Sequence, residues 1–238
     1  MATYVILGGD GQIGKYYIEN YINLDKNKVI VIDIKTISPI PHQNVCYFNF
    51  DVSNEEKYSD LITYLKNEVI SIDYVLFSVG INFQESFFSS SIDNFKKTIN
   101  INFLSFYISL KKLYSFLSRN ASIVTIASQN GIVGHENRID YSPSKAALIQ
   151  IVKNLSIDFS KDKNKDIRIN AVSPGYIHTK NNSEFFNSIN GKKMMKRNPY
   201  NKIAKLDDVC GVIHFLFSSS SYAIRGENIV VDFGYTIV

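Results

Sequence analysis

Short apolar runs alternate with longer amphipathic stretches along the whole chain. The run Val29-Ile30-Val31-Ile32 has no polar position, which is typical of a strand buried on both faces of a parallel sheet. Stretches of helical length separate such runs. By this pattern we expect strands at residues 4–7, 29–33, 44–49, 74–79, 121–127, 167–172 and 228–232, and helices at residues 12–24, 54–66, 91–118, 142–160 and 207–217.

The alternation of strand and helix predicts an α/β fold, a single-domain Rossmann fold with a doubly wound parallel sheet of about seven strands. No linker rich in Gly, Ser or Pro and no internal repeat divides the chain, so residues 1–238 are expected to form one domain. Residues 180–203 are polar, rich in Asn and without periodicity. Such a stretch predicts either a partly helical lid over a substrate or an inert insertion.

The composition excludes several classes of protein. Hydrophobic residues make up 45% of the 238 positions, which is typical of a globular chain with a large core. The net charge is +4 without a long basic run, so we expect no nucleic-acid partner. No apolar run approaches the length of a membrane span and no targeting signal precedes the first strand, which predicts a cytoplasmic protein. Neither Cys46 and Cys210 nor the histidines have the spacing of metal ligands, so no metal is expected.

Glycines at positions 8, 11 and 14 follow the first apolar run and open the first helix. Glycine permits a tight turn and a close approach of the backbone to a pyrophosphate, which the N-terminus of the new helix then faces. Asp33 ends the next strand, 19 residues beyond Gly14. That spacing suits a carboxylate that binds the adenosine ribose of a dinucleotide.

A Tyr with a Lys four residues later is a candidate proton-transfer pair, because the ammonium group lowers the pKa of the phenol, ordinarily about 10. Tyr141 and Lys145 stand at the start of a helix, and Ser128 ends a buried strand upstream, at the edge of the sheet where ligands gather. The rival pairs have no Ser at the corresponding distance, and we expect their Tyr residues to have no role in proton transfer. The three pairs are Tyr107/Lys111, Tyr141/Lys145 and Tyr176/Lys180.

These motifs, in this order, resemble the short-chain dehydrogenase/reductase family over nearly the whole chain. The glycine loop resembles the family's nucleotide loop, and Tyr-Ser-Pro-Ser-Lys-Ala-Ala at 141–147 is close to the family's Tyr-Ser-Ala-Ser-Lys-Ala-Ala. Residues 169–175 are similar to the strand and turn that shape the nicotinamide pocket, and residues 230–234 to the closing strand. The resemblance implies a catalytic tetrad of Asn102, Ser128, Tyr141 and Lys145. It implies cofactor contacts at Gly8, Asp10, Gly11, Gln12, Ile13, Gly14, Asp33, Asp51, Val52, Ser78, Val79, Gly80, Tyr141, Lys145, Pro174, Gly175, Ile177 and Thr179.

The resemblance also implies a mechanism. In reduction, Tyr141 would protonate the developing alkoxide while Ser128 donates a hydrogen bond to the same oxygen. Lys145 would lower the pKa of Tyr141 and hold the nicotinamide ribose, and Asn102 would position a water that leads from Lys145 to solvent. In oxidation these roles reverse.

The sequence departs from the family at a few positions. Gln12 stands where many members have Gly, although the spacing of the remaining glycines is retained. Phe77 and Ser78 replace both Asn of the fourth-strand motif, which leaves open what ties the sheet together at this point. Phe233 replaces a Gly near the C-terminus and would alter the pocket wall or a subunit contact.

These observations predict an oxidoreductase that transfers hydride between NAD(H) and a carbonyl or alcohol, with a sugar or nucleotide-activated sugar as one substrate class. A reductase of 3-oxoacyl groups on acyl carrier protein is the alternative, and Asp33 argues against it because such enzymes usually prefer NADPH. A non-catalytic NAD-sensing module is the third reading. Lys35 lies near enough to Asp33 in sequence to bind the NADP phosphate instead, or else it is a solvated loop residue.

The sequence leaves the substrate and the assembly less defined. The lid carries Lys192, Lys193, Lys196 and Arg197, which would either attract an anionic substrate or form a solvated basic patch. A homotetramer, or else a homodimer, is expected through the helices at 91–118 and 142–160, as in the family, and the first helix has more apolar positions than one core stripe needs. Loop residues expected to border the pocket are Asn82, Phe83, Gln84, His135, Asn137 and Arg138.

Overall fold

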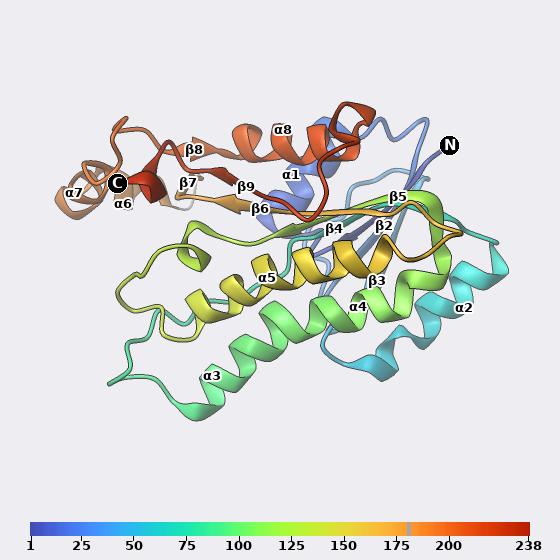
Figure 1. Cartoon of the computed structure of the whole chain (residues 1–238), viewed down its shortest axis with the longest axis horizontal. Coiled ribbons are helices and arrows are strands. Elements are labelled where there is room, and N and C mark those ends of the chain that lie inside the picture. Colours follow the sequence, from blue (N-terminus) through green and yellow to red (C-terminus); the bar gives the residue numbers. More distant parts are fainter. Residues whose placement is uncertain (180–181) are drawn as a thin grey trace.

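The computed structural model describes residues 1–179 and 182–238. Within these residues, seven strands form one wholly parallel sheet in the order β3-β2-β1-β4-β5-β6-β9 (Figure 1). The strands of this sheet are β1 (Thr3–Leu7), β2 (Lys28–Asp33), β3 (Val45–Asn49), β4 (Ile72–Phe77), β5 (Leu117–Ile126), β6 (Arg168–Pro174) and β9 (Asn228–Val231). The order reverses between β1 and β4, so the predicted doubly wound Rossmann fold is confirmed.

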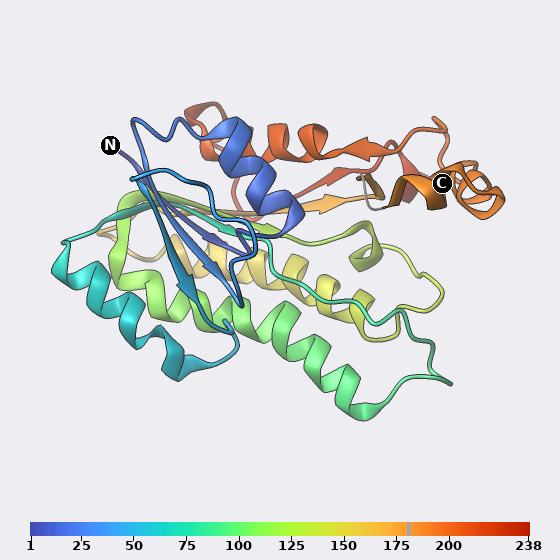
Figure 2. The ribbon, with the colours of Figure 1, turned by 180° about the vertical axis from the view of Figure 1, so that it is seen from behind.

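Helices cover both faces of the sheet. Figures 1 and 2 show α2, α3, α4 and α5 on one face and α1 and α8 on the other. The α-helices are α1 (Gln12–Tyr21), α2 (Ser59–Asn67), α3 (Ile92–Ile99), α4 (Ser105–Leu113), α5 (Tyr141–Phe159), α6 (Ser183–Asn187), α7 (Ile189–Met195) and α8 (Leu206–Phe217). Short 3₁₀ turns lie at Glu55–Tyr58, Tyr114–Phe116, Gln129–Gly131, Ser219–Ser221 and Tyr235–Ile237. None of the helices in the described part of the chain has the length and apolar character needed to cross a bilayer.

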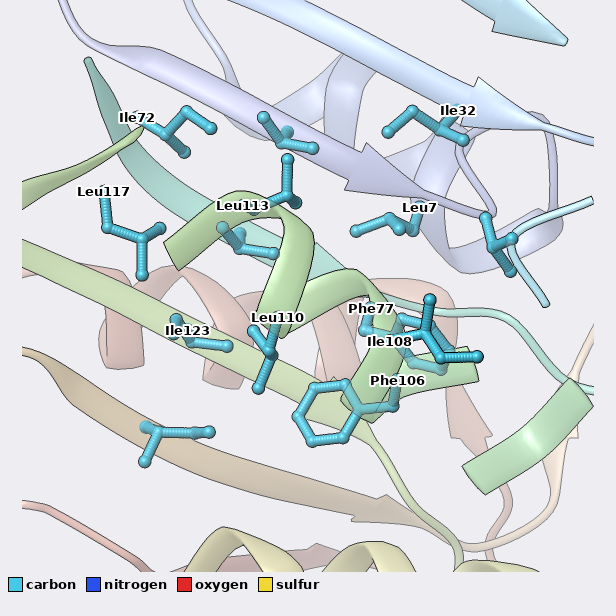
Figure 3. Close-up of a cluster of buried hydrophobic side chains, with 14 of the residues drawn as sticks. Leu7, Ile32, Ile72, Phe77, Phe106, Ile108, Leu110, Leu113, Leu117 and Ile123 are labelled. Atoms are coloured by element: carbon cyan, nitrogen blue, oxygen red, sulfur yellow. The ribbon is translucent and has the colours of Figure 1, made fainter. Parts of the chain in front are cut away.

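Two layers of buried side chains hold the helices against the sheet, because the central strands are apolar on both faces. In the layer below the sheet, Leu7, Phe77 and Phe106 pack together, and the rings of Phe77 and Phe106 lie 5.1 Å apart between centroids (Figure 3). On the opposite face, α1 and α8 contribute Tyr17, Ile18, Val209, Ile213 and Leu216. The strands are therefore fixed in position, and their carboxyl ends form a rigid edge.

The prediction of a single helix over residues 91–118 is wrong at two places, in the interior of the range and at its C-terminal end. A π-helical turn, η2 (Asn100–Leu104), separates α3 from α4, and β5 already begins at Leu117. Asn102 lies in this turn and is fully buried. The Ser105 hydroxyl donates to the Ile101 carbonyl at 2.6 Å, so a side chain binds a backbone group within the turn. Apolar residues continue through the break, which hides it from periodicity.

The segment 180–203 is partly helical in the residues described. Lys180 and Asn181 lie outside the described residues, and α6 and α7 follow. A two-stranded parallel ladder, β7 (Ile177–His178) with β8 (Ala204–Lys205), joins the two ends of the segment. Strands of two residues are too short to produce a period, so no pattern of residues predicts them. The ladder holds the base of the segment beside the carboxyl end of β6.

Candidate active site

The carboxyl ends of the parallel strands meet along one edge, where two adjoining cavities lie. One, of about 250 Å³, is bordered by the glycine loop, the end of β2 and the loops after β3 and β4. The other, of about 380 Å³, extends from the same glycine loop to the start of α5. Both are bordered by Gly11, Ser78, Val79, Gly80 and Ile81, so together they form one elongated site.

The glycine loop is packed so closely that side chains are excluded. Gly8 has φ of +78°, and a Cβ atom there would lie 2.9 Å from the Ser78 carbonyl carbon. A Cβ at Gly14 would lie 2.5 Å from the Gly8 carbonyl oxygen. Gly11 precedes α1 and has no side chain to cap it. The amide groups of the first turn can therefore bind an anion.

Asp33 lies at the end of β2 and borders the smaller cavity. Its Oδ2 accepts a hydrogen bond from the Asp10 amide at 3.0 Å, and its Oδ1 accepts one from the Ile34 amide at 2.8 Å. Asp10 in turn accepts from the Ile37 amide at 2.6 Å, so the carboxylates join the glycine loop to the segment after β2. Lys35 is exposed and does not border this cavity.

Ser78 ties the sheet together at the point where the family's Asn pair is missing. Its amide and its hydroxyl both donate to the Leu7 carbonyl, each at 2.9 Å, and the hydroxyl also lies 3.1 Å from the Gly8 carbonyl oxygen. The neighbouring Phe77 enters the core instead of a polar network. A single hydroxyl thus ties the end of β4 to the glycine loop.

Asn102 holds the loop after β4 against α5. Its Oδ1 accepts from the Ile81 amide at 2.7 Å, while its Nδ2 donates to the Ile81 carbonyl at 2.9 Å and to the Ser144 hydroxyl at 3.0 Å. Gly80 makes this packing possible, because a Cβ there would lie 3.2 Å from the Lys145 Nζ. The amide of Asn102 is therefore committed to positioning the loop and the helix.

Tyr141 and Lys145 border the larger cavity, and the Ser128 hydroxyl lies close enough to Tyr141 to affect its pKa. Ser128 follows β5, and Tyr141 and Lys145 occupy the first two turns of α5. The Lys145 Nζ donates to the Ile126 carbonyl at 2.8 Å and lies 5.7 Å from the centroid of the Tyr141 ring. Ser128 and Lys145 are buried and Tyr141 is partly buried, so the Lys145 ammonium lies in a medium of low dielectric constant.

Burial perturbs both titrating groups of this set. It lowers the pKa of Lys145 from 10.5 to about 7. It raises the pKa of Tyr141, an effect that the Ser128 hydroxyl and then the positive charge of Arg138 oppose. In this geometry the Ser128 hydroxyl and the Arg138 charge favour the phenolate, and the role expected of Lys145 toward Tyr141 stays a prediction. A Lys that burial shifts toward its neutral form gives the phenolate less electrostatic support.

The rival Tyr residues have other surroundings. Tyr107 is partly exposed on α4 and borders, with Lys111, a groove between α4 and α5 rather than the cavity at the strand ends. The Tyr176 hydroxyl lies 2.6 Å from the Nε2 of His135, and its ring packs 5.9 Å from that of Tyr235. Its partner Lys180 lies outside the described residues.

Several of the remaining sequence-predicted residues border the two cavities. Asp51 and Val52 border the smaller cavity, and Gln12, Ile13 and Ile177 border the larger one. Pro174 ends β6, a Cβ at Gly175 would lie 2.9 Å from the Gln129 Oε1, and the Thr179 amide donates to Asn182 Oδ1 at 2.8 Å. Sequence reasoning missed other residues that border the cavities, although the ends of the strands point to them. These are Ile34, Phe50, Ile81, Ile101, Ile126 and Ala127, with Asn82 expected only as a bordering loop residue.

The sheet order, the glycine turn after β1 and the cavity at the point of strand reversal define a doubly wound protein of the class that binds dinucleotides. A family model described as enoyl-(acyl carrier protein) reductase matches residues 28–236. The chain belongs to the short-chain dehydrogenase/reductase family. It is therefore an oxidoreductase of the kind that acts on CH–OH or C=O groups with a nicotinamide cofactor.

Individual relatives differ in what they do. A 3-oxoacyl-[acyl-carrier-protein] reductase of Buchnera aphidicola subsp. Schizaphis graminum is 29% identical over 98% of this chain and 96% of its own length. A short-chain type dehydrogenase/reductase of Sinorhizobium fredii is 26% identical over 98% of this chain, which spans 43% of that protein. The solved structure of 4-hydroxyisoleucine dehydrogenase complexed with NADH is 29% identical, with a TM-score of 0.89 and full coverage of both chains.

Proposed function

We propose that this protein interconverts a carbonyl compound and an alcohol with NAD(H), with Tyr141 as the proton-transfer residue. The observation that carries the proposal is that Tyr141 and Lys145 border a cavity that adjoins the glycine loop, with the Ser128 hydroxyl beside Tyr141. The larger cavity gives a substrate oxygen access to Tyr141, and the smaller one has the shape and polar edge for the adenosine half of the cofactor.

The residues present fit the cofactor. The close contacts at Gly8 and Gly14 leave a backbone cradle that a side chain would fill, and the uncapped start of α1 faces it. Asp33 borders the same cavity and suits the two hydroxyls of an unphosphorylated ribose, which favours NAD over NADP. The NADH named with the 29% identical 4-hydroxyisoleucine dehydrogenase supports this preference. The nicotinamide supplies or takes up hydride when bound.

The side chains of this chain would handle the proton and the developing charge. Tyr141 gives its phenolic proton to the alkoxide formed in reduction, or takes up the alcohol proton in oxidation. Ser128 donates a hydrogen bond to the same oxygen. Lys145 holds the ribose and supplies a titrating group whose pKa of about 7 suits proton relay near neutral pH. Asn102 fixes the loop after β4 relative to α5 through Ile81 and Ser144.

Two other functions compete with a small-molecule dehydrogenase that acts on a sugar or a nucleotide-activated sugar. Reduction of 3-oxoacyl groups is favoured by the 29% identical Buchnera reductase and opposed by Asp33. A module that senses NAD without catalysis is opposed by the presence of all four tetrad side chains in a shared site. Residues 180–203 would form the lid of the site, and a cytoplasmic location stays a prediction.

We also propose that the protein forms a homotetramer, or else a homodimer. Between α4 and α5 lies an open groove of about 410 Å³ bordered by Tyr107, Leu110, Leu155 and Phe159. Apolar surface of this kind on paired helices suits an interface between subunits. A light-scattering mass of two or four times 27.1 kDa at micromolar concentration is expected, and a single-chain mass would refute the interface.

The decisive experiment is a survey of carbonyl compounds with purified protein, NADH and NADPH. The panel contains aldoses, small ketones, oxo acids and an acetoacetyl thioester, and oxidation of the reduced cofactor is followed by absorbance. Turnover with NADH that disappears in Tyr141→Phe is expected. Tight binding of NADH without turnover of any compound would favour the sensing module, and preferential reduction of the thioester would favour the acyl reductase.

A further inference from the structure

Arg138 lies three residues before Tyr141, in the loop between the 3₁₀ turn at Gln129–Gly131 and α5. Its carbonyl accepts from the Ser142 amide at 3.0 Å, so it lies one turn before Tyr141 on the same helical start. Its Nη1 donates to the Asn137 carbonyl at 2.7 Å. Asn137 has φ of +56°, a conformation that Asn tolerates better than most residues. The loop is thus bent so that the guanidinium binds its own backbone.

The guanidinium of Arg138 has more N–H donors than there are hydrogen-bond acceptors around it. Its Nε is buried and has no hydrogen-bond acceptor, and within residues 1–179 and 182–238 no carboxylate lies within 4.0 Å of this side chain. The carboxylate of Asp140, nearby in the loop, already accepts hydrogen bonds from the Thr98 hydroxyl at 2.5 Å and from the Tyr141 amide at 2.8 Å. A partly buried cation without an anion is costly, and a ligand that supplies one recovers that cost.

The adjoining loop offers one internal candidate for the missing anion. The Ile139 amide donates to the Glu85 carbonyl at 3.2 Å, so the two loops run side by side. Glu85 Oε1 accepts from Asn94 Nδ2 at 2.8 Å, whereas Glu85 Oε2 is buried without a partner. The test must therefore separate a role for Arg138 toward substrate from a structural pairing with Glu85.

The positive charge of Arg138 lowers the pKa of two nearby tyrosines, Tyr141 and Tyr176. Burial raises the pKa of Tyr176, and the charges of Arg138 and Arg197 oppose this, as Arg138 also does at Tyr141. Lys192, Lys193 and Lys196 on the lid are exposed and solvated. Of the four basic residues of the lid named from the sequence, Arg197 thus acts on Tyr176 together with Arg138 of the loop before α5.

We propose that the substrate carries an anionic group, a carboxylate or a phosphate, which Arg138 binds while the carbonyl oxygen faces Tyr141 and Ser128. This inference rests on the proposed function and narrows its substrate class to anionic carbonyl compounds and the corresponding hydroxy compounds. The planar guanidinium suits both oxygen geometries through paired hydrogen bonds. Arg138 is then a specificity-determining residue, and Tyr141 carries out the same proton transfer as before.

The test compares matched substrates that differ in charge. Acetoacetate is paired with methyl acetoacetate, and dihydroxyacetone phosphate with dihydroxyacetone, each with NADH at saturation. We expect the wild type to prefer the anionic member of one pair by at least about tenfold in kcat/KM, with the gain in KM. The pair that shows the preference identifies carboxylate or phosphate as the anion.

Three variants locate the source of that preference. Arg138→Gln should bring the anionic-to-neutral ratio close to one, because any loss that acts through the pKa of Tyr141 slows both members of a pair equally and leaves their ratio unaffected. Arg119→Gln is the matched control, because this exposed Arg lies at the opposite end of β5 from Ser128, and it should keep the full ratio. Glu85→Gln should also keep it. A loss in Glu85→Gln equal to that in Arg138→Gln would assign the Arg to internal pairing and overturn the inference.

The inference and the proposed function can fail separately. If the wild type reduces neutral carbonyl compounds as well as anionic ones, or if Arg138→Gln keeps the ratio, the inference is wrong and the dehydrogenase activity stands. If neither these compounds nor the wider panel is reduced with either cofactor, the proposed function itself is wrong.

Discussion

Replacing Gly14 by Ala tests whether the glycine loop is built for a ligand or only for a turn. A Cβ at this position would lie 2.5 Å from the Gly8 carbonyl oxygen and 2.8 Å from the Gly9 Cα, both backbone atoms. Neither can rotate away, so the loop or the start of α1 must shift by several tenths of an ångström. The shift would fall on the backbone amides that we propose bind the pyrophosphate.

The expected magnitudes follow from two opposing effects. Ala is better than Gly inside a helix by about 1 kcal/mol, while overpacking of a tight contact costs about 1–3 kcal/mol. Gly14→Ala should therefore lower the free energy of unfolding by about 0–2 kcal/mol. Gly211→Ala in α8 is the matched control, because its nearest atom would be the Tyr21 hydroxyl at an ordinary 3.6 Å. That variant should be stabilised by about 0.5–1 kcal/mol.

Two measurements check this reasoning. Urea denaturation gives the free energy of unfolding of both variants, and titration of protein fluorescence gives the Kd for NADH. We expect Gly14→Ala to bind NADH at least about tenfold more weakly, a loss of roughly 1.4 kcal/mol, and Gly211→Ala to bind normally. Equal stabilisation of the two variants with unchanged NADH affinity would show that the close contact at Gly14 and its role in binding are both mistaken.

Three further predictions concern the reacting groups and the choice of cofactor. Tyr141→Phe should lose about two to four decades in turnover with little change in NADH affinity, whereas Tyr107→Phe and Tyr176→Phe should stay active; near-normal turnover in Tyr141→Phe would exclude it as the proton donor. Wild-type protein should prefer NAD(H) by at least about tenfold in a steady-state comparison, and Asp33→Ala should lose most of that preference through weaker NAD(H) use; equal use of NADPH by the wild type would contradict the ribose role of Asp33. Because burial lowers the pKa of Lys145 to about 7, the unfolded chain holds more protons between that pH and about 10, so the free energy of unfolding should rise with pH by up to about 1.4 kcal/mol per unit. Denaturation curves of the wild type and of Lys145→Met over this window check the last prediction, and parallel pH profiles would contradict it.

The sequence predicted the sheet well because its strands are buried on both faces. Val29 to Ile32 are fully buried, so no polar position could be tolerated there, and the apolar run marks the strand directly. The seven expected strands are all found, with ends displaced by at most four residues. The largest displacement is at β5, whose first residue Leu117 pairs with Ile72 across an irregular register. Pairing across the sheet set that boundary, and no local pattern reports it.

Residues of the candidate site could be predicted from the sequence where they lie at or just beyond the end of a strand. Gly8 directly follows β1, Asp33 ends β2 and Ser128 lies two residues beyond the end of β5, so their shared edge follows from the topology alone. The Ser78 tie depends on how the end of β4 packs against the glycine loop. A single sequence does not contain that contact as a pattern.

The break between α3 and α4 shows why one error in the fold prediction falls at the site. A regular helix through residues 91–118 would satisfy every backbone group locally and would have no reason to bury an amide side chain. The π-helical turn places Asn102 in the interior, where it bonds both groups of Ile81 and the Ser144 hydroxyl. Ser144 in turn donates to the Tyr141 carbonyl at 2.6 Å. One irregular turn therefore links the loop that borders both cavities to the residue proposed to transfer the proton. The π-helical turn has less favourable backbone hydrogen bonds than a regular helix, and the fixed position of the loop relative to Tyr141 offsets this loss.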